Sequence, residues 1–137
     1  MLALQADIRY CNMITVNKIK KICEQFANLR IAVIGDMMLD HYLWGSVERI
    51  SAEAPVPVVD IKKEEYRLGG AANVINNINS LNAKSDVYGV CGNDKYADRL
   101  DELFKAIKVD NVFIIKDENR PTTLKSRIIA SQQQIVR

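Results

Sequence analysis

The hydrophobic residues of this chain alternate along its length between helical and extended spacing. Residues 15–29 carry apolar side chains three or four positions apart, which predicts an amphipathic helix. The next run, IAVIGD at 31–36, is short and β-branched, and carries no charge until its last residue. Such runs are typical of strands in parallel sheets that are buried on both faces, so we expect a strand there.

Helical spacing returns at residues 70–81, where the apolar side chains share one face. Asn82 follows directly, and asparagine tolerates the left-handed backbone conformation that often ends a helix. Residues 85–92 then predict a second strand. Asp94 is a suitable N-cap for a further helix with an apolar face.

Three further segments have β character. NVFII at 111–115 predicts a third strand, and residues 122–130 and 133–137 follow with a short polar turn between them. The segment 55–61 is also rich in β-formers, but its two prolines cannot donate to a ladder, which indicates an edge strand or a small outlying sheet. Strands that alternate with helices predict an α/β fold with a parallel sheet.

The composition indicates a globular protein and gives no support for a nucleic-acid-binding or membrane protein. The 137 residues are 48% hydrophobic and 26% charged, which is typical of one globular domain or a piece of one. The net charge of +2 gives no electrostatic argument for nucleic acid as a partner. No apolar run reaches the roughly 18 residues of a membrane span, so we expect no membrane partner.

The cysteine pattern and the first residues of the chain indicate the cellular compartment in which we expect the protein. The three cysteines form no CxxC pair, which favours reduced thiols in the cytoplasm over a disulfide framework or a zinc site. Residues 1–14 lack the basic start and long apolar stretch of a signal peptide, and we expect a disordered extension there.

Asp36 is the first candidate for chemistry. It stands at the end of the first predicted strand, and ligands of open α/β sheets bind at the carboxyl ends of strands. Its carboxylate can accept hydrogen bonds from hydroxyl groups such as those of a sugar. The alternative is an aspartate that caps the next segment. IGDMMLD is not GxGxxG, so no dinucleotide fingerprint supports a Rossmann oxidoreductase.

The small residues of LGGAAN precede the helix predicted at 70–81. Gly69 and Gly70 allow backbone angles and close approaches that any side chain would block. The helix start leaves N–H groups unpaired, and Asn73 adds a side chain that both donates and accepts. Two explanations stay open: a tight loop that packs the helix on the sheet, or a small ligand close to the backbone.

Lys125 and Arg127 are two residues apart on a predicted strand, so their side chains leave the same face. Two cations on one face can bind a phosphate, and arginine can do so with two parallel hydrogen bonds. The alternative is a solvated strand face. His41 is the only histidine, and we expect it to lie in a loop without a function.

Four segments together resemble one family of enzymes. IGDMMLDHYLWGSVERISAEAPVPVV, RLGGAANVINNINSL, GNDKYADRL and PTTLKSRIIASQQQIVR occur in the order seen in the ribokinase-like (PfkB) sugar kinases. The ERISAEAPVPV segment narrows the resemblance to the D-glycero-β-D-manno-heptose 7-phosphate kinases, including the kinase half of the bifunctional enzyme that also carries an adenylyltransferase. The resemblance spans residues 31–137.

The resemblance implies a fold and a set of site residues. The fold is the N-terminal part of a ribokinase-like three-layer αβα kinase domain over residues 15–137, with a small β-sheet lid. Lid strands are expected at about 42–61 and 122–137, and this family often dimerises through the lid. The residues that the resemblance assigns to the sugar phosphate are Asp36, Gly69, Gly70, Asn73, Lys125 and Arg127.

The implied reaction is phosphorylation of the anomeric hydroxyl of D-glycero-β-D-manno-heptose 7-phosphate, with ATP and Mg²⁺ as cofactors, on the route to ADP-heptose. The family's catalytic aspartate and anion hole lie in a GxGD-type motif that this sequence lacks. Phosphoryl transfer depends on a base and on charge stabilisation. We therefore expect no catalytic residue in this chain, no activity of the chain alone, and a nucleotide pocket in a missing C-terminal half.

Two alternatives stay open. Another PfkB sugar or nucleoside kinase would share the glycine motif, but would have no use for a phosphate site at Lys125 and Arg127. A non-catalytic remnant would bind sugar phosphate or only dimerise. The expected partners are a sugar phosphate, a second copy through the lid, and a separately supplied C-terminal half.

Overall fold

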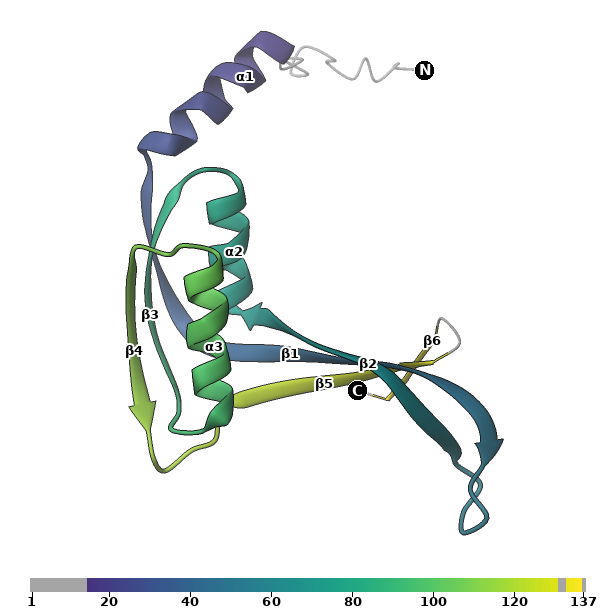
Figure 1. Ribbon diagram of the computed structural model, residues 1–137. Helices are drawn as coiled ribbons and strands as arrows, with labels where there is room; N and C mark the ends of the chain where they lie inside the picture. The colour runs from purple at the N-terminus through teal and green to yellow at the C-terminus, as the bar shows by residue number, and fades with distance from the viewer. Residues whose placement is uncertain (1–14, 131–132, 137) are drawn as a thin grey trace, which may run out of the picture.

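One long strand joins two β-sheets in the computed structural model, which describes residues 15–130 and 133–136 (Figure 1). The disordered extension predicted at 1–14 lies outside the described residues. A short 3-10 turn at Phe26–Asn28 separates the first helix from the first strand. The helices are α1 (Val16–Gln25), α2 (Ala71–Ser80) and α3 (Lys95–Ala106), and the strands are β1 (Arg30–Ile50), β2 (Pro57–Gly70), β3 (Lys84–Gly92), β4 (Asn111–Asp117), β5 (Thr123–Ala130) and β6 (Gln133–Val136).

The main sheet contains three parallel strands in the order β4-β3-β1. Residues 30–36 of β1 belong to it, in register with β3 up to the pair Asp36–Val90. Helices α2 and α3 connect its strands, as the alternation of patterns predicted. The predicted α/β fold with a parallel sheet is confirmed.

The second sheet has the strand order β2-β1-β5-β6, and it contains the rest of β1. The predicted strand end at Asp36 is therefore wrong. The strand continues because its side chains alternate between a buried face, with Met37 and Leu39, and an open face. Hydrogen bonds from β2 and β5 also satisfy its backbone on both sides.

Strand β2 lies at an edge of the second sheet, since its only neighbour among the described strands is β1. The edge strand predicted at 55–61 is thus confirmed, but it begins at Pro57 and continues to Gly70. With β1 it forms a long hairpin that extends away from the helices (Figure 1).

Helices α2 and α3 lie side by side on one face of the main sheet, where they bury the core (Figure 1). Met37, Ile75, Leu100 and Phe104 are at most 2% exposed. Met37 packs directly over β3 at Gly89, where an added Cβ would lie 2.6 Å from its Cγ. This face therefore holds the close-packed interior of the molecule.

Two local predictions at helix ends are confirmed. Asp94 Oδ1 accepts hydrogen bonds from the backbone N–H groups of Tyr96 and Ala97, each at 3.0 Å, and so caps α3. Asn82 follows α2 with a φ of 63°. Both features depend on the chemistry of one residue and its immediate neighbours, which makes them readable from sequence.

The other face of the main sheet is not covered by any described helix. Ile34 is 80% exposed, Ile115 is 69% exposed and Phe113 is 54% exposed. The prediction that strand 31–36 is buried on both faces is wrong for the described part of the chain, because α2 and α3 both lie on the opposite side. These residues form a sheet and one helical layer of the three-layer fold that the resemblance implies.

Helix α1 confirms the helix predicted at 15–29, with its regular part over Val16–Gln25. Thr15 caps it by accepting a hydrogen bond from the Lys18 N–H at 3.3 Å. None of its residues is buried, and it projects from the end of the main sheet (Figure 1).

Candidate functional site

The glycine-rich turn joins β2 to α2, and each of its two glycines is required for a different physical reason. Gly70 has a φ of +54°, a conformation that side chains other than glycine rarely adopt. A Cβ on Gly69 would lie 3.0 Å from Cγ of Asp40 on the neighbouring strand. Backbone conformation and close packing therefore account for both glycines without a ligand.

Asp40 lies beside this turn, and we did not predict it as a site residue from the sequence. The register of the second sheet places it between Arg67 on β2 and Lys125 on β5. Its Oδ1 lies 2.7 Å from Nη1 of Arg127, and the side chain is 20% exposed. The available signal was its even spacing from Asp36, which puts both carboxylates on one face of a continuous strand.

A hollow of about 390 Å³ is lined by residues of β1, β2, α2 and α3. Asp40 and Asn73 both line it, which places one predicted site residue beside the aspartate. Its wall mixes hydrogen-bonding groups with apolar surface, as small-molecule sites do. The lining residues are Asp40, Tyr42, Tyr66, Arg67, Leu68, Asn73, Asn76, Leu103, Ala106 and Ile107.

Asn73 and Asn76 face the hollow from the first turns of α2. They are three residues apart, so a helix places them on the same side. The helix has no side-chain cap at its start, where Gly70 is exposed. Amide side chains, unpaired N–H groups and a carboxylate together can accept from and donate to the hydroxyls of a sugar.

Lys125 and Arg127 share one face of β5, as predicted, because they stand opposite Asp40 and Tyr42 of β1. Lys125 is exposed, whereas the Arg127 side chain is only 17% exposed. The N–H of Arg127 Nη1 is not aligned with the Asp40 oxygen as a hydrogen bond requires, so we describe the pair as an ionic contact. Contact with this carboxylate raises the pKa of the Arg127 guanidinium.

Asp36 lies in different surroundings from the other predicted site residues. Its Oδ1 accepts a hydrogen bond from Arg120 Nη2 at 2.9 Å, and its Oδ2 accepts one from the Thr123 hydroxyl at 3.1 Å. It borders a hollow of about 730 Å³ over the open face of the main sheet, not the hollow beside Asn73. The structure therefore does not bring Asp36 together with Asn73.

The segment that contributes Arg120 is held against the end of β3. The Thr122 N–H donates to Asp94 Oδ2 at 2.9 Å, and the Thr122 hydroxyl accepts from the Gly92 N–H at 3.0 Å. A Cβ on Gly92 would lie 2.4 Å from the Thr122 nitrogen. Glycine at position 92 thus lets the chain cross from the main sheet to the second sheet beside β1.

His41 corrects another prediction. It lies on β1, not in a loop, and is 9% exposed. Its Nε2 is 2.7 Å from Glu64 Oε1, its Nδ1 is 3.1 Å from Ser126 Oγ, and its ring stacks on Tyr66. Hydrogen bonds from Tyr66 and His41 lower the pKa of Glu64, while burial and the bond to Glu64 raise the pKa of Tyr66 to about 12.

Neither a metal site nor a membrane helix is found in the described part of the chain. No three side chains of His, Cys, Asp or Glu within it lie close enough together to hold a metal ion. Its helices are all too short or too polar to cross a membrane.

Comparison with known sequences agrees with the motif resemblance. The profile of the pfkB family carbohydrate kinases matches residues 28–137. The chain is 55% identical over 107 residues to the bifunctional protein HldE of Aliarcobacter butzleri (strain RM4018), which covers 78% of this chain and 22% of that protein. It is 53% identical over 117 residues to HldE of Sulfurimonas denitrificans (strain ATCC 33889 / DSM 1251), which covers 85% of this chain and 24% of that protein.

Solved structures show the same fold. Phosphofructokinase-2 from Escherichia coli superposes with a TM-score of 0.63 at 16% identity, over 80% of this chain and 35% of that chain. The chain therefore spans about a third of this structure and about a quarter of the HldE proteins. Because the family profile covers most of its length, the chain belongs to the pfkB family of carbohydrate kinases.

Proposed function

We propose that the full-length protein uses ATP to phosphorylate D-glycero-β-D-manno-heptose 7-phosphate at its anomeric hydroxyl, in ADP-heptose biosynthesis. This chain would supply the sugar-binding part. The observation that carries the proposal is the hollow at the start of α2, where Asp40 and Asn73 lie together. The motif resemblance to heptose 7-phosphate kinases and the identity to HldE proteins support the choice of sugar.

Within the hollow, each group has a distinct role in the proposal. The Asp40 carboxylate accepts hydrogen bonds from sugar hydroxyls, and Asn73 both donates and accepts. Gly69 and Gly70 keep the turn free of side chains beside them. Lys125 and Arg127 stay proposed substrate ligands, on the strand beside Asp40. Asp40 takes the sugar-binding role that the resemblance gave to Asp36, since Asp36 borders the other hollow.

Nucleotide and metal binding belong to the full-length protein in this proposal. Carbohydrate kinases of this family use ATP and Mg²⁺, and the described residues form no cluster of metal ligands. The sequence also lacks the GxGD-type motif that supplies the family's base and anion hole. We therefore expect the chain alone to bind sugar without transferring phosphate, in the cytoplasm, where ATP is available.

A titration by calorimetry tests this proposal. We expect the 137-residue chain to bind heptose 7-phosphate saturably and to show no binding of ATP. Asp40→Asn should weaken sugar binding about tenfold or more, because hydrogen bonds to a charged group are stronger than those to a neutral amide. Ser80→Ala, at the far end of α2, is the matched control and should bind as wild type does.

Two results would remove the proposal. Tighter binding of a nucleoside or an unphosphorylated sugar would favour another PfkB kinase. ATP binding to the folded chain would show that the nucleotide pocket is not where we place it.

A further inference from the structure

The aromatic and basic side chains on the open face of the second sheet form an ordered group. We infer that Arg67 and Arg127, placed around the ring of Tyr42, form a binding site for the phosphoryl group of a sugar phosphate. The inference rests on the proposed function. It adds Arg67, a residue of β2 that the sequence analysis did not assign, as the side chain that selects phosphorylated over unphosphorylated sugar.

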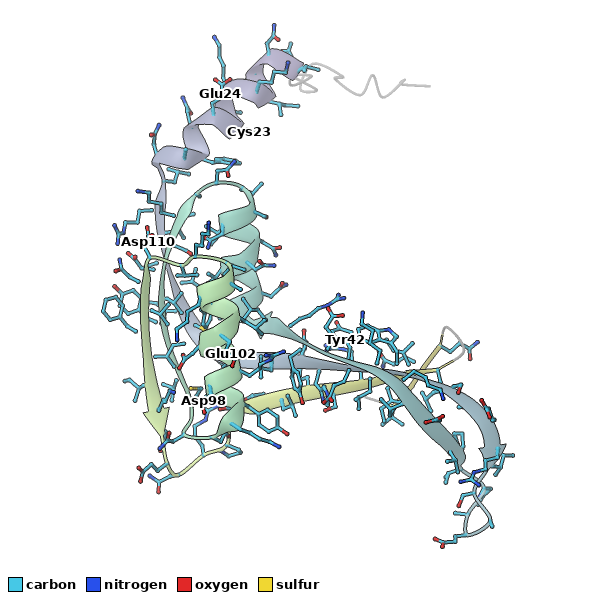
Figure 2. All side chains as sticks on the ribbon, in the orientation of Figure 1. Cys23, Glu24, Tyr42, Asp98, Glu102 and Asp110 are labelled. Carbon is cyan, nitrogen blue, oxygen red and sulfur yellow. The ribbon has the colours of Figure 1, made fainter. Side chains whose placement is uncertain are left out.

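The two arginines reach one aromatic ring from the strands on either side of β1. The guanidinium carbon of Arg67 lies 5.0 Å from the centre of the Tyr42 ring, and that of Arg127 lies 5.2 Å from it. Figure 2 shows Tyr42 on the part of β1 beyond the main sheet, away from Asp98 and Glu102 on α3. Cation–π contacts hold each guanidinium in place, so little order is lost when an anion binds.

The charges of this face leave an excess of cations. In the rows of Asp40, Tyr42 and Trp44, strand register assigns four cations and two carboxylates, namely Lys63, Arg67, Lys125 and Arg127 against Asp40 and Glu65. Glu65 contacts Arg67 through Nε, at 2.5 Å, which leaves the two terminal nitrogens of Arg67 without a hydrogen-bond partner among the described residues. Those two donors match two oxygens of a phosphate.

The position of the site relative to the hollow indicates its ligand. Arg67 and Tyr42 line the same hollow as Asp40 and Asn73. A ligand with hydroxyls at Asp40 and Asn73 and a phosphate at its far end would meet both sets of groups at once. An unphosphorylated sugar would gain nothing from the guanidinium groups, because charge-assisted hydrogen bonds need the anion.

Trp44 provides the readout for the test, since it is the only tryptophan of the chain. Its ring stacks on Tyr42 at 5.4 Å, and the Arg67 guanidinium lies 5.9 Å from it. The 137-residue chain is titrated with heptose 7-phosphate, with unphosphorylated heptose and with inorganic phosphate, and the fluorescence of Trp44 is followed.

Arg67→Gln is expected to weaken binding of the phosphosugar about tenfold or more and to change binding of free heptose less than about twofold. Arg67→Lys keeps the charge but loses the planar guanidinium, so its affinity for the phosphosugar should lie between those of wild type and Arg67→Gln. Lys84→Gln removes the same charge at the start of β3, in the main sheet, and should bind as wild type does.

Equal binding of the phosphosugar by Arg67→Gln and Lys84→Gln would overturn the anion site, as would a wild-type chain that binds phosphosugar no more tightly than heptose. Failure of the proposed function looks different. Arg67-dependent binding of inorganic phosphate and of other sugar phosphates, without preference for the heptose, would keep the anion site and remove the heptose assignment. If Arg67→Gln does not fold by circular dichroism, Arg67→Lys decides the question.

Discussion

Asp36 and Asp40 are identical in chemistry and share one strand, yet their surroundings give them different roles. Both oxygens of Asp36 already accept hydrogen bonds, from Arg120 and Thr123, at the point where the chain crosses between the sheets. Asp40 contacts Arg127 and borders the hollow that contains Asn73. At the scale of single residues, geometry therefore favours Asp40 as the main sugar ligand.

Substitution of the two aspartates separates these roles. Asp36→Asn should lower the free energy of unfolding by up to about 1 kcal/mol, since its ion pair is partly exposed, and leave heptose 7-phosphate affinity within about threefold. Asp40→Asn should show a large loss of affinity, and because its contact with Arg127 is more buried than that of Asp36 with Arg120, it should lower the free energy of unfolding at least as much. Urea denaturation and calorimetry on the same samples measure both. Loss of affinity in Asp36→Asn alone would restore Asp36 as the sugar ligand.

A second prediction concerns Gly92. An alanine Cβ there would lie 2.4 Å from a backbone nitrogen, that of Thr122, which cannot rotate away as a side chain can. Gly92→Ala should therefore destabilise the chain by about 3 kcal/mol or more. Gly35→Ala is the comparison, because the nearest atom to its Cβ is the methyl group of Ala71 at 2.9 Å. In thermal unfolding, Gly92→Ala should have a much lower melting temperature than Gly35→Ala. Similar melting temperatures would contradict the close packing of Gly92 against the Thr122 backbone.

At the scale of elements, Asp94 ties α3 to the segment that enters β5. One carboxylate oxygen caps the helix and the other accepts from the Thr122 N–H. Burial by itself would raise the pKa of Asp94, but these hydrogen bonds outweigh it and lower the pKa below the ordinary value of 3.8. The stabilisation is therefore present at neutral pH and is lost as the pH falls below 3.8, through the pKa of the folded state.

Two variants separate the helix cap from the hydrogen bond between Asp94 and the Thr122 N–H. Asp94→Ala loses both and should cost about 2 kcal/mol at pH 7, whereas Asp94→Ser keeps a capping oxygen and should cost about half of that. The difference between wild type and Asp94→Ala should narrow as the pH falls from 5 to 3. Urea denaturation across that range is the measurement, and a constant difference would show that the carboxylate charge plays no part.

Sequence predicted those elements whose signals are local. The cap at Asp94, the left-handed turn at Asn82 and the start of α2 after Gly70 each depend on a few adjacent residues. The continuation of β1 past Asp36 was missed, because it depends on pairing with β2 and β5, which are distant in the chain.

The site shows the same division. Gly69 and Asn73 were selected from a compact motif and stay predicted site residues, whereas Asp40 became a candidate only when strand register placed it opposite Arg67. His41 was assigned to a loop without a partner, yet it contacts residues 23 and 85 positions away in the chain. Contacts of that range are set by the fold and leave no local pattern in the sequence.

For the whole molecule, the main feature is the large exposed apolar surface on the open face of the main sheet. Ile34 and Ile115 are 80% and 69% exposed, and Tyr88 and Phe113 stack on each other in the same sheet. Contiguous apolar surface of this kind promotes association. The proposed dimer of the full-length protein would instead use the second sheet as its lid interface, so the two surfaces can be tested against each other.

We expect the 137-residue chain to self-associate through the open face at micromolar concentration. Ile34→Lys should shift it toward monomer, whereas Ile50→Lys, near the tip of the β1–β2 hairpin, adds the same charge at a residue that is 70% exposed and should leave association unchanged. Sedimentation velocity measures the species present. The reverse ranking would place the contact on the second sheet.

Hydrogen exchange of the backbone amides with and without heptose 7-phosphate decides between the two hollows, because it locates the sugar. We expect slower exchange at residues 38–42 and 67–76, around the hollow that contains Asp40 and Asn73, with little change in α1 and no change on addition of ATP. Protection by ATP, or protection by the sugar confined to the open face of the main sheet near Asp36, would contradict the assignment of the sugar site.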